Sequence, residues 1–552
     1  MRRFLVLLVL SLPLCPAQDL LQILSGELTR NFTALRQKAD PAPYFMAYEV
    51  TSDESESLAF TLGALTARGS NHGRYFDVTV RVGTPKLDNY HVVRGQFPRF
   101  TSGAAIPLDN VAPAIRQRVW LDTDRAYRLA AQRLIQIQSD DSLKVASADQ
   151  SADFSSEPTE KFTGSIPKLK VPMDAWEPVL RKASATLGAS PGVLSSTVYL
   201  SIERRATYFV NTEGTHIAQG RLYCRIVINA AGKTEDGMNL EAVRTFEAAD
   251  PSHLPKPAEI ESAAQAAGNE LTSLTTAPVI DPYVGPAILS GRAAGVFFHE
   301  IFGHRVEGFR QKSEDEGQTF TKSVGKPVLP DFLSVVFDAT RKTIGDTDLN
   351  GSYDYDDEGV KARPVTVVDH GILKTFLLSR MPIQGFDHSN GHGRRQPGHE
   401  VMARQSNLIV ESSRQVSGAG LRKMLIDEVK RQNKPYGLYF KDITGGFTLT
   451  QRAGLQAFTV IPLVVYRVYP DGRPDELVRG VSIVGTPLAS FGKILATSDH
   501  SEVFNGYCGA ESGTVPVSAV SPALLLGEIE VQKSETSSQR PPLLPRPTET
   551  KP

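Results

Sequence analysis

The stretch that decides how the C-terminal half of this chain folds is Val296–His304, with the sequence VFFHEIFGH. Large apolar residues lead into two histidines, His299 and His304, which bracket Glu300. Neutral imidazoles bind zinc, and a glutamate that is not a ligand can take a proton from water at the metal. The stretch therefore predicts a zinc site on a buried helix. A core helix with two hydrogen-bonded histidines is the alternative.

The spacing of the two histidines is unusual. In the HExxH arrangement of many metalloproteases the histidines lie about 40° apart around the helix. His299 and His304 are five positions apart, which places them about 140° apart on a regular helix. A shared metal therefore requires the backbone to depart from α geometry between them. Gly303 tolerates such a departure, and we expect a π-type turn there.

The sequence around these histidines resembles a known family. The segment Gly295–Gly308 is similar to the HExxxH helix of the TldD/PmbA family of metallopeptidases. The family's third zinc ligand is a cysteine near the C-terminus, and Cys508 occupies the matching position. Further similar segments follow in the family's order, over about half of the chain: Tyr355–Gly359, His370–Lys374, Asn390–Arg395, Asp442–Gly446, Asn505–Gly509 and Ser512–Val517.

A separate count of cysteines also points to Cys508. The chain has three cysteines, of which Cys15 lies in a segment expected to be removed and Cys224 in a β-like run, where a buried position is expected. Cys508 stands among glycines in an expected loop, which favours a ligand or a reactive thiol. A Cys224–Cys508 disulfide in an oxidising compartment is the alternative. A thiolate and two imidazoles leave one zinc position open, as catalysis requires.

The N-terminus predicts a secretory signal peptide. Basic Met1–Arg3 precedes the apolar run Phe4–Leu14 and small residues, so cleavage is expected after Ala17. The protein is then secreted or periplasmic, whereas TldD relatives are mostly cytoplasmic, so their substrates are not carried over. Acylation of Cys15 is the alternative. No other stretch is apolar for long enough to span a membrane.

Length and patterning predict an α+β protein with two domains, a mixed N-terminal domain and a strand-rich C-terminal domain that carries the HExxxH helix. The net charge of −1 gives no electrostatic reason for binding nucleic acid. The expected parts are a signal peptide at 1–17, an N-terminal α+β domain at 18–250, a linker and helix at 251–284, a metallopeptidase domain at 285–532 and a disordered tail at 533–552.

Local patterns predict the main elements of both domains. Helices are expected at Gln18–Lys38, around Thr123–Ile137, at Pro257–Thr275 and at Leu421–Lys434. Strands are expected at Tyr44–Val50, Ser57–Thr66, Arg74–Val82, Thr197–Arg205, Ala206–Asn211 and Gly220–Ala230. Hairpins are expected around Asp369–Gly371 and Asp471–Gly472.

An acidic segment resembles an EF-hand calcium loop in its spacing. Its flanks read as loop and strand rather than helices, and its last position is Asp instead of the usual Glu. A solvated acidic turn is therefore the favoured interpretation, and a calcium site is the alternative. The candidate calcium ligands are Asp346, Asp348, Asn350, Asp354 and Asp357.

Four further residues are candidates for supporting roles. His392, Arg394 and Arg395 are candidates for substrate binding, with ordinary loop polarity as the alternative. Glu307, three residues after His304, either supports a ligand ring or faces solvent, and we expect solvent.

The function predicted from these features is that of a secreted zinc peptidase. His299, His304 and Cys508 bind zinc with their ligand atoms within about 4 Å of one another, and Glu300 is the general base. The resemblance implies unfolded, extended peptide substrates that add as a strand, and a homodimer or a heterodimer with a related family member. The alternatives are a companion subunit that binds peptides without cutting them, and a thiol hydrolase with Cys508 as nucleophile.

Overall fold

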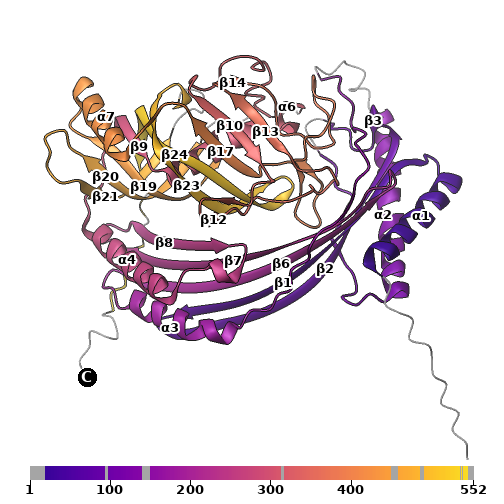
Figure 1. Ribbon diagram of the computed structural model, residues 1–552, viewed down its shortest axis with the longest axis horizontal. Coiled ribbons are helices and arrows are strands. Elements are labelled where there is room, and N and C mark those ends of the chain that lie inside the picture. The colour runs from indigo at the N-terminus through magenta and orange to yellow at the C-terminus, as the bar shows by residue number, and fades with distance from the viewer. Residues whose placement is uncertain are drawn as a thin grey trace, which may run out of the picture.

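The computed structural model describes residues 19–93, 97–139, 149–312, 316–448, 450, 458–484, 490–534, 536 and 539–544 (Figure 1). The expected signal peptide, with Cys15, lies outside these residues, as does part of the expected tail. Within the described part, no helix is both long and apolar enough to cross a membrane. The architecture is α+β in two domains, as predicted.

A long, curved and mainly antiparallel sheet dominates the N-terminal domain, with β5 paired in parallel to β7 (Figure 1). Its strand order is β3-β2-β1-β6-β7-β5, with β4 paired to β2 and β8 paired to β7. Apolar side chains of the helices pack on one face, and the C-terminal domain lies against the other. The elements are α1 (Leu20–Lys38), β1 (Pro43–Thr61), β2 (Ala64–Thr84), β3 (Leu87–Asp88), β4 (Ala104–Ala105), α2 (Ala112–Ser139), β5 (Lys161–Thr163), α3 (Met173–Gly188), β6 (Ser195–Asn211), β7 (His216–Lys233) and β8 (Asn239–Ala248).

The strands of this sheet are longer than the sequence predicts. The predicted strands Tyr44–Val50 and Ser57–Thr66 correspond to one strand, β1, whose hairpin turn falls inside the second prediction at Gly63. The acidic residues between them belong to the strand because β6 supplies counter-charges, such as Arg205 for Asp53 at 2.7 Å. The helix predicted around Thr123–Ile137 also begins earlier, and α3 was not predicted.

The C-terminal domain is a second sheet built around one helix, α5 (Gly291–Ile301). The order is β14-β13-β10-β17-β24-β22-β20-β19-β9, and β9 also pairs with β24, which closes that part of the sheet on itself. Helix α4 (Pro257–Thr276) precedes this domain in the chain and packs in the core of the N-terminal domain. The main elements of the C-terminal domain are β9 (Tyr283–Leu289), β10 (Leu333–Asp338), β13 (Pro364–Asp369), β14 (Ile372–Leu373), β17 (Asn407–Ser412), α7 (Gly418–Arg431), β19 (Gly437–Thr448), β20 (Phe458–Val468), β21 (Glu476–Val478), β22 (Val481–Val484), β23 (Ile494–Ala510) and β24 (Gly513–Lys533).

Helix α5 lies directly on this sheet. Its apolar residues belong to the largest hydrophobic core of the domain. Gly295 permits the close approach, because a Cβ there would lie 2.9 Å from the carbonyl oxygen of Ala519 on β24. The sheet therefore fixes the position of the helix that carries His299 and Glu300. The predicted hairpins at Asp369–Gly371 and Asp471–Gly472 are confirmed as β13–β14 and β20–β21 pairings.

Candidate metal centre

The α-helix ends before the second histidine of the pair. Helix α5 stops at Ile301, and Gly303–Val306 form a 3-10 turn rather than the predicted π-type turn. A Cβ on Gly303 would lie only 1.9 Å from Oε1 of Gln405, whose Nε2 donates to the carbonyl oxygen of His299 at 3.2 Å. Glycine thus makes room for an amide that binds the end of the helix.

The break in the helix brings the two imidazoles to one cysteine. Cys508 Sγ lies 3.3 Å from Nε2 of His304, and the ring centres of His299 and His304 are 5.1 Å apart. The three ligand atoms lie within 4.8 Å of one another, slightly more than the predicted 4 Å. Each residue is more than nine-tenths buried. In the described part of the chain, this is the only group of three or more His, Cys, Asp or Glu residues placed to share a metal.

The sequence predicted a loop at Cys508, but in the structure this residue lies in a strand. It belongs to β23, which pairs with β24 up to Ala510, and it stands opposite Val515. The glycines around it are part of this hairpin. Its backbone hydrogen bonds fix the position of Cys508 and so hold the thiol beside the histidines. Cys224 is buried elsewhere, and both cysteines are free, so the alternative disulfide is not formed.

Charges around Cys508 favour the thiolate. Burial disfavours the charged form, but His304, His299 and the Arg404 guanidinium outweigh it and hold the pKa of the thiol well below its usual range. Burial also opposes the charge on His304, yet Cys508 and Glu307 raise its pKa to about 10. In the absence of a metal, the donors therefore form a thiolate–imidazolium pair. These three donors suit zinc in their chemical softness, their number and their arrangement, because zinc prefers sulfur and nitrogen ligands.

Glu307 supports this centre instead of facing solvent, which corrects the expectation from the sequence. Its side chain is fully buried, and Oε2 lies 3.2 Å from Nδ1 of His304. Arg310 Nε donates to the same oxygen at 2.9 Å, and the nearby cations keep the pKa of Glu307 low despite its burial. A carboxylate at Nδ1 orients the ring and leaves Nε2 free for a metal.

Arg404 links the cysteine to this carboxylate. Its Nη2 donates to Sγ of Cys508 at 3.2 Å and to the carbonyl oxygen of the same residue at 2.7 Å. Its Nε lies 3.3 Å from Oε1 of Glu307. Arg404 was not predicted from the sequence, because an arginine in a polar stretch looks solvent-exposed. The spacing of Glu307, one helical turn after His304, was the available signal for the carboxylate.

Glu300 faces a cavity of about 400 Å³ beside the three donors. Burial raises the pKa of its carboxyl group, although His299 and His304 oppose this effect. Gly445 and Gly446 of β19 line the same cavity, so a ligand can approach the backbone there.

The predicted substrate-binding residues do not line this cavity. His392 is fully buried and contacts Asn390 and Ser406. Arg394 and Arg395 line a second cavity instead. Their roles in substrate binding stay predictions.

The candidate calcium ligands are not gathered around one point. Asp348 accepts from His253 Nδ1 at 2.9 Å and from a backbone N–H, and Asn350 Nδ2 donates to the carbonyl oxygen of Gly506. Asp357 accepts from the backbone N–H of Arg395 at 2.7 Å. Asp346 and Asp354 complete the set, but no three described carboxylates here form a metal group. The predicted solvated turn fits Asp346 and Asp354, which are exposed, but not Asp348 and Asn350, which are buried because they bond to other parts of the protein.

Replacing Glu307 with glutamine is expected to weaken zinc binding by about 10–100-fold, because a neutral amide polarises the His304 ring less than a carboxylate does. Titration with a competing chelator of known zinc affinity measures this change. Glu411→Gln, an exposed control on β17, should leave zinc affinity unchanged. Equal affinities for the two variants would show that Glu307 has no influence on the ligand.

The chain is similar to known metallopeptidases over its C-terminal half. Residues 283–533 match the family model of the PmbA/TldA metallopeptidase C-terminal domain. A metalloprotease of Methanocaldococcus jannaschii is 27% identical over 314 residues, which are 56% of this chain and 63% of the relative. A protein of Saccharolobus solfataricus named a zinc metalloprotease TldD homolog is 25% identical over 251 residues, which are 45% of this chain and 51% of the relative. The aligned region thus spans about half to two thirds of these relatives.

A similar fold is found in TldE from Thermococcus kodakarensis. The TM-score is 0.58 at 13% identity, and the match covers 91% of this chain and all of that one. The fold and the metal centre place this chain among proteins related to metallopeptidases. Residues 283–533 are similar to the C-terminal domain of the TldD/PmbA family.

Proposed function

We propose that this chain is a secreted zinc peptidase that hydrolyses unfolded peptides. The convergence of His299, His304 and Cys508 beside Glu300 carries this proposal. The donor set fits zinc, and one relative is named a zinc metalloprotease. The basic and apolar start of the chain supports secretion.

The residues of the centre have distinct roles in this proposal. His299, His304 and Cys508 would hold the zinc ion, while Glu307 and Arg404 fix the positions of His304 and Cys508. A bound zinc ion supplies Lewis acidity, which polarises a carbonyl group and acidifies water. Glu300 takes a proton from the attacking water and delivers it to the leaving amine. Burial of its carboxyl raises the pKa, which suits a group that must both accept and donate.

The sheet next to the centre supports an extended substrate. Strand β9 pairs with β19 only at Leu438–Phe440. Farther along β19, Gly445–Thr448 pair with β20 on one side, and no described strand pairs with them on the other. Because this segment borders the cavity, a peptide can add there as a strand. For the oligomeric state, we propose that the chain forms a dimer, either with a second copy of itself or with a related family member.

A thiol hydrolase is the second candidate, because Cys508 Sγ lies 3.3 Å from an imidazole nitrogen of His304. Chelation separates the two candidates when cleavage of an unfolded peptide library, zinc content and thiol labelling are measured together. We expect chelation to abolish cleavage and to speed labelling of Cys508, and zinc to reverse both. Cleavage by zinc-free protein would favour the thiol hydrolase. Bound zinc without cleavage would favour the companion subunit.

A further inference from the structure

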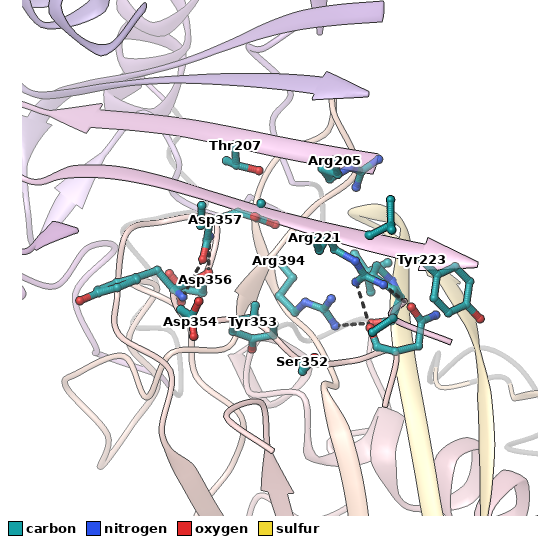
Figure 2. A pocket seen from close by; sticks show the side chains of 18 of the residues that line it. Arg205, Thr207, Arg221, Tyr223, Ser352, Tyr353, Asp354, Asp356, Asp357 and Arg394 are labelled. Atoms are coloured by element: carbon teal, nitrogen blue, oxygen red, sulfur yellow. Dashed lines mark hydrogen bonds between the residues drawn. The ribbon is translucent and has the colours of Figure 1, made fainter. Parts of the chain in front are cut away.

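A second cavity, of about 260 Å³, lies between the N-terminal sheet and the C-terminal domain (Figure 2). Strands β6 and β7 form one wall, and Ser352–Asp357 form much of the other. Val515 lines this cavity and packs with Cys508, which lines the cavity of the metal centre, so the two cavities lie close together at the β23–β24 hairpin. A single water needs only about 10–15 Å³, so this volume far exceeds a water site.

Two arginines at one end of the cavity have no carboxylate partner. Arg221 donates to the carbonyl oxygen of Asn350 at 2.9 Å, and Arg394 donates to that of Pro516 at 2.7 Å. Among the described residues, no carboxylate oxygen lies within 4.0 Å of either guanidinium. Burial lowers the pKa of both side chains. A buried cation without a counter-charge is unfavourable, so this end suits an anion.

Acidic side chains occupy a different part of the cavity. Figure 2 shows Asp354, Asp356 and Asp357 together, away from Arg221 and Arg394. The oxygens of Asp356 accept from backbone N–H groups, so that carboxylate is already bound within the protein. Asp354 is about half exposed, with Lys342 at 3.8 Å as its counter-charge. Asp354 is therefore available to a cationic group, as is Oδ1 of Asp357, whose other oxygen, Oδ2, accepts from the backbone N–H of Arg395 at 2.7 Å.

Three nearly buried side chains in the lining have unused hydrogen-bonding atoms. Tyr223 Oη, Glu49 Oε2, and Nε and Nη1 of Arg395 have no hydrogen-bond partner among the described residues. These residues are 4–5% exposed, and all three line the cavity. Buried polar atoms are normally bonded. Unused donors and an unused acceptor together indicate a ligand that both accepts and donates.

We propose that this cavity binds a zwitterionic ligand, a free amino acid or a short peptide with free termini. The carboxylate contacts Arg221 and Arg394, and the ammonium group contacts Asp354 and Asp357. Such molecules are what a peptidase releases, but binding here does not depend on an active metal centre.

Calorimetry on the full zinc-loaded chain tests the ligand chemistry, with Glu300→Gln as the background so that peptides are not cleaved. The probes are alanine, Ala-Ala, N-acetyl-Ala-Ala, Ala-Ala-amide and acetate. We expect alanine or Ala-Ala to bind, and both blocked dipeptides to bind at least about tenfold more weakly than Ala-Ala. Whichever of alanine and Ala-Ala binds more tightly shows whether the ligand is a free amino acid or a short peptide. Acetate binding as tightly as either, or no binding by any probe, would overturn the proposal.

Substitutions in the lining test whether the probe binds in this cavity. Arg221→Gln should weaken binding of the preferred probe at least about tenfold and leave zinc content unchanged. Arg414→Gln is the matched control, because Arg414 is exposed and also bonds a carbonyl oxygen. Asp354→Asn, at an exposed position that tolerates change, should weaken binding of the ammonium group, whereas Asp427→Asn on α7 should not. Unchanged affinity in both Arg221→Gln and Asp354→Asn would overturn the assignment.

Discussion

Replacing Glu300 with glutamine is expected to lower peptidase turnover by about 10²–10⁴-fold and to leave the fold and the zinc content unchanged. Glutamine has nearly the same shape as glutamate but cannot accept the proton of water. Glu300 lines the cavity beside the three donor residues without being one of the convergent ligands. The loss should therefore appear in kcat and not in metal binding.

Turnover of an unfolded peptide library and zinc per chain should be measured on the same preparation. Glu411→Gln, exposed on β17, is the control for an ordinary loss of a carboxylate. Full turnover by Glu300→Gln would mean that another group activates water. Loss of zinc from the variant would mean that Glu300 is needed for the integrity of the centre.

Replacing Cys508 with alanine is expected to lower zinc affinity by more than about 100-fold, the upper range for loss of a mere supporting hydrogen bond. The variant removes one of three donors and leaves the Arg404 guanidinium without the sulfur that it contacts at 3.2 Å. Peptidase activity should fall with zinc occupancy. A chromophoric zinc chelator in competition measures the affinity.

Cys224→Ala is the matched control, because Cys224 is equally buried but lies in the core of the N-terminal domain. Its zinc affinity should equal that of the unchanged chain. If Cys508→Ala also kept its zinc, the thiol would not be a ligand, and the two histidines would need another donor.

Much of the fold could be predicted from local patterns, but strand length could not. The segment Asp53–Glu56 looks like a polar loop in the sequence. In the structure it continues β1, because β2 and β6 pair with it on both sides and Arg204 lies within ion-pair distance of Glu54. The partners on β6 lie about 150 residues away in the chain, so no local pattern reveals them.

The metal-site candidates stood out in the sequence because their residue types are chemically distinctive. Their supporting residues did not. Glu307 and Arg404 are fully buried, yet charged residues are rarely buried unless they are paired. Each is buried because the other, together with Arg310 and Cys508, balances its charge. That mutual dependence exists only in the folded chain.

The separation of the donors along the chain has a consequence for biosynthesis. Cys508 lies 204 residues after His304, on a hairpin whose second strand forms the centre of the C-terminal sheet. A ribosome that adds about 5–20 residues per second needs roughly 10–40 s to cover that distance. During this interval the emerging polypeptide carries both histidines and Glu300 but lacks the sulfur donor. The three donors can therefore come together only after Cys508 has been synthesised, so the proposed peptidase has no complete metal centre during this interval.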